Sequence, residues 1–486
     1  MNAPATTSPA TTPPSWVAPT SAALAALAEA AGPGNAITDA DTLAPHLVDW
    51  RRKHFGATPL LLLPRTTAQV SAIVAAAARH RVALVPQGGN TGLVGGGIPP
   101  ADGSAVLVSL KRMNKIGPMD PQGLTMRAEA GAILSDVHDA AAAAGLVFPL
   151  SLAARGSATI GGLTATNAGG VQVLRHGTMR ALIAGLKAVL PDGSILDQLA
   201  GLPKDNQGYD LKQLLIGSEG TLGIITELTL KLVSAPDARV VAWAGLANPA
   251  AALALLARLR RASGGQVESF ELIPDLGLQL VLRHVPGARP PLSGAYPWHV
   301  LVEMAGPARL AEVMEQALGE ALEGGEIGDA TIAGSEAQAA SLWHLRETLP
   351  EAERRDGPAV HHDISVPVAA LPGFVLAATA EIEQRIKGSQ VIAFGHLGDG
   401  NLHFNVRAPR KADGAGWSAQ ETGVITGLVH DLVHAAGGSI SAEHGIGTLK
   451  RADLARLLPP ARLNMMRAVK HAIDPAGIMN PGKILQ

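Results

Sequence analysis

Apolar residues recur along this chain with two spacings, one typical of helices and one typical of buried strands. Residues 21–29 and 67–74 place apolar side chains every three or four positions, which predicts amphipathic helices. Four other segments are short and rich in apolar residues, which predicts strands. These segments are residues 60–63, 83–86, 182–190 and 224–232. The first half of the chain therefore predicts helices packed on sheets.

The second half also mixes helices and strands. Residues 250–261 and 307–322 have helical spacing, and residues 299–304 form a strand-like run. Two further apolar runs, at 391–394 and 402–406, flank the tetrapeptide Gly-Asp-Gly-Asn, which favours a tight turn with positive φ. We expect these two runs to form a β-hairpin.

Two histidines lie at the ends of this predicted turn. His396 just precedes it and His403 just follows it, so their imidazoles can meet across the strands as two ligands of one ion do. Glu443 ends another strand-like run at 438–442, and a carboxylate beside two imidazoles completes a ligand set with open coordination positions. The same residues also fit a metal-free alternative, in which the imidazoles are ordinary surface or hydrogen-bonded groups.

Glycines gather in a few segments. Residues 87–97 follow a predicted strand and contain six glycines, whose bare backbone N–H groups suit a diphosphate. This segment lacks the Gly-Lys-Ser/Thr ending of nucleotide triphosphatases and the helix that follows the glycines in dinucleotide-binding folds. By itself it could equally be a linker, but further glycine-rich segments at 156–162, 166–170 and 217–224 predict a long ligand lying along the backbone.

Composition narrows the function classes. The chain has 486 residues, of which 47% are hydrophobic, so it is long enough for two or three packed units. Its formal net charge is −2 and it has no basic block, so we expect no nucleic-acid partner. It has no cysteine, which excludes disulfides, thiolate-bound iron–sulfur clusters and thioether-linked cofactors. Redox chemistry would need a bound organic group or a non-thiolate metal.

The first 20 residues are rich in Ala, Pro, Thr and Ser. They lack the basic start and apolar run of a signal peptide, so we expect a disordered tail. No apolar run approaches the length needed to cross a membrane, because Arg, Glu or His interrupts the Ala-rich segments. The sequence therefore predicts a soluble, cytoplasmic protein.

The order of these motifs resembles that of the FAD-linked oxidases of the vanillyl-alcohol oxidase type. The motifs are Pro-Gln-Gly-Gly-Asn-Thr-Gly at 86–92, Ala-Thr-Asn-Ala-Gly-Gly at 165–170, Gly-Ser-Glu-Gly-Thr-Leu-Gly at 217–223 and Asp-Pro-Ala-Gly-Ile-Met-Asn-Pro-Gly-Lys at 474–483. Within this group the chain looks most like the D-2-hydroxyacid dehydrogenases, which include D-2-hydroxyglutarate and D-lactate dehydrogenases. The resemblance covers nearly the whole chain, from residue 59 to residue 486.

This resemblance implies an α+β fold. It consists of a two-subdomain FAD-binding unit of the PCMH type and an inserted cap, or substrate, domain built on an antiparallel sheet. On this sequence the tail spans 1–20, the FAD-binding domain 21–236 and the cap domain 237–425. A C-terminal segment, 426–486, is expected to return to the FAD-binding domain.

The resemblance also implies which residues hold FAD. The 86–92 loop would bind the diphosphate, residues 149–170 would line the isoalloxazine and ribityl chain, residues 223–224 would lie near the adenine, and Asn480 would close over the flavin. The implied set is Pro86, Gln87, Gly88, Gly89, Asn90, Thr91, Gly92, Pro149, Leu150, Gly156, Ser157, Gly161, Gly162, Thr166, Asn167, Gly169, Gly170, Gly223, Ile224 and Asn480. FAD is expected to be non-covalent, because members that tether it often carry a histidine where this chain has Asn90, and because no cysteine is present.

The metal ligands and the base follow from two more motifs of the resembling dehydrogenases. His-Leu-Gly-Asp-Gly-Asn-Leu-His and Glu-His-Gly bind a divalent metal there, often zinc, and both are intact here. The implied metal ligands are His396, His403 and Glu443. The implied base is His444, with the alternative that its imidazole only orients Glu443. The implied substrate-binding residues are Arg346, which lies in a Leu-Arg-Glu segment, His361, Asn405 and His444.

One position departs from the pattern. His361 stands where the resembling dehydrogenases usually have a lysine that meets the distal acid group of the substrate. An imidazole is shorter than a lysine side chain and only partly charged at neutral pH. The change could weaken selectivity for dicarboxylates, shift the pH optimum, or indicate another 2-hydroxyacid.

The resemblance implies an FAD- and divalent-metal-dependent dehydrogenase that oxidises a D-2-hydroxyacid to the 2-oxoacid by hydride transfer to flavin N5. D-2-hydroxyglutarate is the first expected substrate, and D-lactate or D-malate is the alternative. The electron acceptor would be an electron-transfer flavoprotein, a quinone or another carrier, and a homodimer is compatible with the sequence. Two other classes remain open, a metal-free oxidase of the same fold and a non-catalytic flavoprotein subunit. The intact His/His/Glu set, Arg346 and His444 argue against both.

Overall fold

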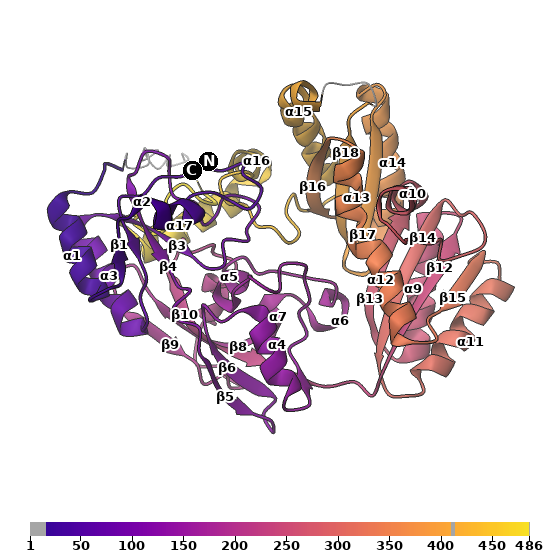
Figure 1. The fold of residues 1–486 in the computed structure, drawn as a ribbon, viewed down its shortest axis with the longest axis horizontal. Coiled ribbons are helices and arrows are strands. Elements are labelled where there is room, and N and C mark those ends of the chain that lie inside the picture. Colours follow the sequence, from indigo (N-terminus) through magenta and orange to yellow (C-terminus); the bar gives the residue numbers. More distant parts are fainter. Residues whose placement is uncertain (1–15, 410–413, 486) are drawn as a thin grey trace, which may run out of the picture.

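The computed structural model describes residues 16–409 and 414–485, which form two units lying side by side (Figure 1). Helices α16 (Arg451–Leu457) and α17 (Pro460–Ile473) near the C-terminus lie with the first unit (Figure 1). Most of the expected disordered tail falls outside the described residues, and residues 16–20 contain no helix or strand. Within the described ranges, no helix is both long enough and apolar enough to span a bilayer.

The first unit contains a small, mostly parallel sheet of order β1-β2-β4-β3. Its strands are β1 (Ala36–Ile37), β2 (Leu61–Leu62), β3 (Ala83–Gln87) and β4 (Ala105–Ser109). The parallel strands β2, β4 and β3 are almost wholly buried, as their apolar runs predict. Helices α1 (Ser21–Ala31) and α3 (Thr67–His80) share a core with this sheet. Helix α3 begins after Thr66, whose hydroxyl accepts the Gln69 N–H.

A five-stranded antiparallel sheet of order β5-β6-β10-β8-β9 completes the first unit. Its strands are β5 (Ile116–Asp120), β6 (Thr125–Glu129), β8 (Ile183–Val189), β9 (Ile195–Gln198) and β10 (Ile224–Lys231). The connections contain α4 (Leu134–Ala142), β7 (Leu146–Val147), α5 (Ile160–Ala165), α6 (Val173–His176), α7 (Met179–Leu182), α8 (Lys212–Leu215) and β11 (Val233–Ser234). The strands expected at 182–190 and 224–232 are confirmed as β8 and β10.

The second unit is built on a seven-stranded antiparallel sheet of order β15-β12-β14-β13-β17-β18-β16. Its strands are β12 (Ala238–Leu246), β13 (Val267–Pro274), β14 (Trp298–Gly306), β15 (Asp329–Ile332), β16 (Ala359–Ser365), β17 (Gln390–His396) and β18 (Asn401–Arg407). Because side chains alternate along a strand, the sheet forms a core on each face. Ala242 belongs to the core under α9 (Pro249–Ser263), α11 (Leu310–Glu323), α14 (Leu371–Arg385) and α15 (Gly414–Ala435). Trp243 belongs to the core under α10 (Asp275–His284), α12 (Glu336–Glu347) and α13 (Leu349–Asp356).

The predicted hairpin is present as the antiparallel pair β17 and β18, in which Phe394 pairs with His403. Its turn contains a short 3₁₀ segment and ends at Gly400, whose φ of 86° is the positive value expected. The expected strand at 438–442 is wrong. Only an isolated bridge between Ser365 and Ser439 forms there, because the chain next to it bends away into the loop that carries Glu443.

The packing of α15 bears on the domain boundaries. Ile425, Val429 and Val433 of this helix lie in the core of the second unit. The sequence expectation ended the cap domain at residue 425, and this packing favours a later boundary. We therefore propose that the cap extends to about residue 440 and that the returning segment starts after it.

Candidate flavin and metal site

A cleft in the first unit lies between the glycine-rich loops. It holds about 1050 Å³ of space free of atoms, including the part open to solvent. The expected FAD residues that line it are Pro86, Gln87, Gly88, Gly89, Asn90, Thr91, Gly92, Gly161, Gly162, Thr166, Gly223 and Ile224. Glu219, Gly220 and His444 also line it. The loops that the sequence predicted to share one long ligand therefore surround one cleft.

The cleft is shaped by backbone rather than by side chains. A Cβ atom on Gly89 would overlap the Ser157 carbonyl, so these two loops can pack only with glycine at this position. Asn90 has a left-handed φ of 58°, and its amide donates to the Val48 carbonyl at 2.9 Å. Glycine-rich backbone offers N–H groups with no side chains in the way, which suits an anionic diphosphate, so the residues that line this cleft fit FAD.

Two polar side chains brace the cleft. Gln87 donates to the Gly97 carbonyl at 2.9 Å. Asn480 joins the C-terminal segment to two cleft loops, because its amide donates to the Gly96 carbonyl at 3.0 Å and to the Glu219 carbonyl at 2.6 Å. Asn480 Oδ1 is buried and has no hydrogen-bond partner within the described ranges. A buried acceptor without a partner can receive a hydrogen bond from a bound cofactor.

The remaining expected FAD residues do not line this cleft in the structure. They are Asn480, which braces the cleft as described above, and Pro149, Leu150, Gly156, Ser157, Asn167, Gly169 and Gly170. Ser157 supports the wall of the cleft from behind, under Gly89. Gly169 lies next to the metal ligands instead, because a Cβ atom there would be 3.3 Å from Glu443 Oε1.

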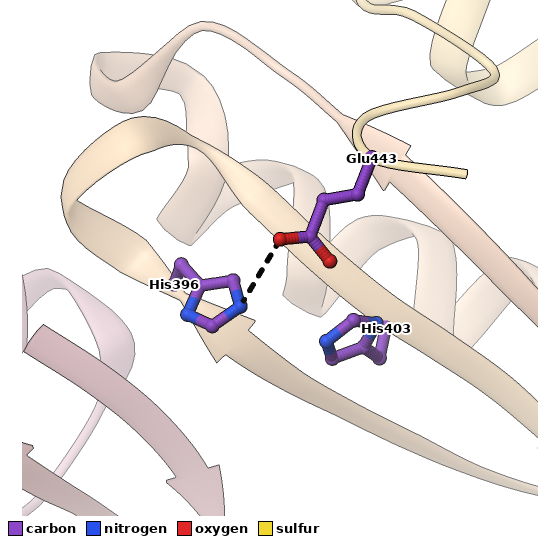
Figure 2. Close-up of side chains that lie close together, drawn as sticks. All are labelled: His396, His403 and Glu443. Carbon is purple, nitrogen blue, oxygen red and sulfur yellow. Dashed lines mark ion pairs between the residues drawn. The ribbon is translucent and has the colours of Figure 1, made fainter. Parts of the chain in front are cut away.

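The three expected metal ligands come together at the end of the hairpin (Figure 2). His396, His403 and Glu443 each offer a ligand atom within 4.8 Å of the others, and His396 Nε2 lies 3.8 Å from Glu443 Oε1. Burial lowers the pKa of His403 to about 3, so this imidazole is neutral at physiological pH. Burial also raises the pKa of the Glu443 carboxyl. Two imidazoles and a buried carboxylate around one point fit a divalent cation, which would relieve the cost of charging Glu443.

Glu271 on β13 holds this set from behind. It is fully buried, accepts from Arg346 Nε at 2.7 Å and lies 2.5 Å from His396 Nδ1. Burial favours the neutral carboxyl, but His396 and Arg346 outweigh burial and hold the pKa of Glu271 well below its usual range. Burial likewise opposes charge on His396, but Glu271 raises the pKa of that imidazole. Glu271 keeps a proton on Nδ1 of His396, and the other ring nitrogen of His396, Nε2, faces Glu443.

His444 lies where the metal set meets the flavin cleft. Its Nδ1 is 3.5 Å from Asp363 Oδ2, and Asp363 also accepts the backbone N–H groups of Glu443 at 2.9 Å and His444 at 3.0 Å. Asp363 thus holds both the loop and the imidazole. Burial lowers the pKa of His444 to about 4 against the opposing charge of Asp363, so the imidazole is neutral at physiological pH.

Glu219 joins the cleft to the loop that carries His444. Its carboxylate accepts the Ile446 N–H at 2.7 Å and the Gly447 N–H at 2.8 Å. Its φ is 50°, a left-handed conformation that costs free energy for a residue with a side chain. Burial raises the pKa of this carboxyl. Glu219 is therefore a strained, buried acid at the contact between the flavin cleft and the loop that carries His444.

Besides His444, the expected substrate residues Arg346, Asn405 and His361 belong to elements of the second unit. Arg346 on α12 is buried, and its guanidinium carbon lies 4.8 Å from the ring centre of Phe394. Asn405 on β18 is buried and donates to Glu353 at 2.6 Å. His361 on β16 pairs with Asn405 across the strands and keeps 39% of its side chain exposed.

Sequence reasoning missed Glu271, Asp363 and Glu219. Glu271 lies inside an apolar segment, Phe270-Glu271-Leu272 in a wholly buried strand, and Glu219 lies inside a glycine-rich segment. A carboxylate in such a segment requires partners when it is buried. This signal was available in the sequence, but the identity of the partners was not, because they come from distant strands.

Comparisons with known proteins identify the family to which this chain is similar. The family described as "FAD binding domain" matches residues 58–198, and the family described as "FAD linked oxidases, C-terminal domain" matches residues 235–484. The mitochondrial D-2-hydroxyglutarate dehydrogenase of Bos taurus is 39% identical over 464 residues, 95% of this chain and 83% of that protein. The D-2-hydroxyglutarate dehydrogenase of Xanthomonas citri pv. viticola is 39% identical over 439 residues, 90% of this chain and 91% of that protein.

A solved structure of p-cresol methylhydroxylase with bound substrate shares the fold. Its TM-score is 0.75 at 16% identity, with 95% of this chain and 96% of that chain covered. Fold and site together define an FAD-linked oxidoreductase. The chain belongs to the FAD-linked oxidase family, which confirms the resemblance and the α+β fold expected from the motifs. The relative from cattle is named as mitochondrial, so the expected cytoplasmic location stays a prediction.

Proposed function

We propose that this protein is an FAD- and divalent-metal-dependent dehydrogenase that oxidises a D-2-hydroxyacid to the 2-oxoacid, with zinc as the metal. D-2-hydroxyglutarate is the first proposed substrate, because the relatives described above are named for it. D-lactate and D-malate are the alternatives. The observation that carries the proposal is the meeting of His396, His403 and Glu443 beside a flavin cleft that His444 also lines.

The site offers one place for each part of this reaction. The glycine-rich loops would hold FAD, and His396, His403 and Glu443 would hold the ion. When bound, FAD supplies the hydride acceptor, and the ion supplies a Lewis acid that makes the substrate hydroxyl more acidic. The acceptor for the second half-reaction is proposed to be an electron-transfer flavoprotein, a quinone or another carrier.

His444 is the proposed base for the hydroxyl proton. With Asp363 next to Nδ1, the favoured neutral tautomer carries its proton on Nδ1 and leaves Nε2 as the acceptor. Because burial holds the pKa of His444 at about 4, the imidazole is ready to accept a proton over the whole physiological range.

Arg346 is the proposed partner of the substrate's C1 carboxylate. Glu271 engages only its Nε, and within the described ranges no other carboxylate pairs with this guanidinium. Its two terminal nitrogens therefore remain for a bidentate pair. Holding the carboxylate in this way would orient the C2–H bond of the substrate, which is how positioning would contribute to catalysis.

Anaerobic mixing of the purified yellow protein with D-2-hydroxyglutarate, D-lactate and D-malate tests this proposal. We expect loss of the visible flavin absorbance with at least one of these acids, and we expect a chelator to abolish it. Bleaching that is indifferent to chelation would remove the metal from the proposal and favour a metal-free oxidase. No bleaching by any of the three acids, with metal content verified, would refute the dehydrogenase proposal.

A further inference from the structure

A buried carboxyl lies behind His361. Glu353 on α13 has no exposed surface, and its Oε2 accepts from Asn405 Nδ2 at 2.6 Å and lies 3.8 Å from His361 Nε2. Its other oxygen, Oε1, is buried without a hydrogen-bond partner within the described ranges. A carboxyl in this state is costly, and burial raises the pKa of Glu353 to about 7.

The charges around this pair favour a neutral imidazole. Burial lowers the pKa of His361 to about 4, and Arg51, Lys53 and His444 add to the same shift. The cation whose charge acts on Glu353 is Arg407, and its guanidinium is already paired with Asp356. Below about pH 7 the pair therefore holds one extra proton, on Glu353, and above that pH it holds none.

The pair shares a sheet face with the metal set. In the β16–β18 register Asp363 pairs with His403, and His361 pairs with Asn405 two residues further along. Side chains two residues apart point to the same face, about 7 Å apart. A 2-hydroxyacid anchored between Arg346 and the metal ligands, with its chain running along these strands, would meet the exposed edge of His361.

We propose that His361 and Glu353 form a proton-holding pair that admits a second carboxylate on the substrate only while the pair carries its extra proton. The proposal rests on the 2-hydroxyacid function proposed above and specifies how the same site treats dicarboxylates. It assigns Glu353, which the sequence did not single out, as a specificity-determining residue acting through His361.

The two proton states present different groups to the substrate. With Glu353 protonated, the carboxyl is neutral, and the His361 imidazole, whose Nε2 lies 3.8 Å from Glu353 Oε2, can donate its proton to a carboxylate on the substrate. With Glu353 ionised, its negative charge attracts the imidazole proton toward Nε2 and repels a second carboxylate. An alkyl group at the same place is little affected by this charge.

The experiment compares D-2-hydroxyglutarate with D-2-hydroxypentanoate, which has the same chain length but no second carboxylate. The measured quantity is the ratio of their kcat/KM values from about pH 6 to about pH 9, where the distal carboxylate is fully ionised. The ratio cancels titrations that both substrates share, including those of His444 and Glu443. We expect the ratio to fall tenfold per pH unit above about pH 7.

Two variants identify the groups responsible. Glu353→Gln cannot ionise, and its amide oxygen can still accept from Asn405, so we expect a ratio that stays flat across the range. His361→Lys supplies a fixed cation, and we also expect a flat ratio, at a higher value. Glu351→Gln on the same helix, whose native carboxylate pairs with exposed Arg355, is the matched control and should keep the native fall.

The outcomes separate this inference from the proposed function. A flat native ratio, or a fall that persists unchanged in Glu353→Gln and His361→Lys, overturns the pair while the 2-hydroxyacid function stands. Oxidation of neither acid by the metal-loaded protein overturns the proposed function, and the inference with it. If Glu353→Gln does not fold, the native profile and His361→Lys still decide.

Discussion

The flavin cleft and the metal site are neighbours built by opposite means. The cleft is made of loops whose glycines let one backbone lie against another, as Gly89 does against Ser157. The metal site is made of charged and polar side chains from separate strands, such as Glu271 on β13 and His403 on β18. Shape defines the first region and charge defines the second. Substitutions that add volume should therefore damage the cleft, and substitutions that alter charge should damage the metal site.

The largest expected effect is the loss of a proposed metal ligand. His403→Ala removes one imidazole of the three-residue set, so we expect loss of the bound metal and a fall in kcat of about 10³-fold. FAD should stay bound, because His403 does not line the cleft. Metal analysis by mass spectrometry and the ratio of flavin to protein absorbance measure the two effects separately.

The control for this variant is His80→Ala, which changes an exposed histidine at the end of α3. It should keep metal, FAD and activity. If His403→Ala lost FAD together with its metal, the two regions would not be independent, and the contrast drawn here between shape and charge would fail.

Adding one methyl group to the cleft should have the next largest effect. Gly89→Ala places a Cβ atom against the Ser157 carbonyl, and relieving that overlap costs about 1–3 kcal/mol. We expect FAD affinity to fall by up to about 100-fold, with the metal retained. Gly319→Ala on α11 is the control, because a Cβ atom there meets nothing within 4 Å and Gly319 does not line the cleft. Flavin fluorescence titration of the apoprotein measures both, and equal losses would contradict the steric account.

The sequence predicted these two regions unequally well, for the same physical reason. The cleft loops depend on local backbone conformation, so the clustered glycines at 87–97 and 217–224 predicted them directly. The hairpin that carries His396 and His403 was also predictable, because a Gly-Asp-Gly-Asn turn fixes its register. The loop that carries Glu443 was mistaken for a strand, because it is held by Asp363 from a distant strand and not by its own sequence. Partners such as Glu271 and Glu353 are fixed only by tertiary packing.

A smaller effect is expected when charge is removed behind a ligand. Glu271→Gln keeps the volume of the side chain but replaces an acceptor of the His396 proton with a group that can donate to Nδ1. The imidazole would then move its proton to Nε2, the nitrogen that faces Glu443, and metal affinity should fall by about tenfold. Competition with a chelator of known affinity measures this fall. Glu268→Gln on the same strand is the control, since Glu268 pairs with Arg239 away from the metal ligands. Unchanged metal affinity in Glu271→Gln would refute the role given to Glu271.

The smallest effect is expected at Glu219, where shape and charge meet. Its carboxylate holds the backbone N–H groups of Ile446 and Gly447, two and three residues beyond His444, while its backbone carbonyl accepts from Asn480. In Glu219→Gln one of these N–H groups faces an amide NH₂ and loses its acceptor, at a cost of about 1 kcal/mol. If Glu219 positions the loop of His444, kcat per bound flavin should fall about fivefold with FAD and metal retained. If it only shapes the cleft, FAD affinity should fall and kcat per bound flavin should not, which would assign Glu219 to the cleft alone. Glu227→Gln, on the neighbouring strand β10 and paired with Lys187, should change neither quantity.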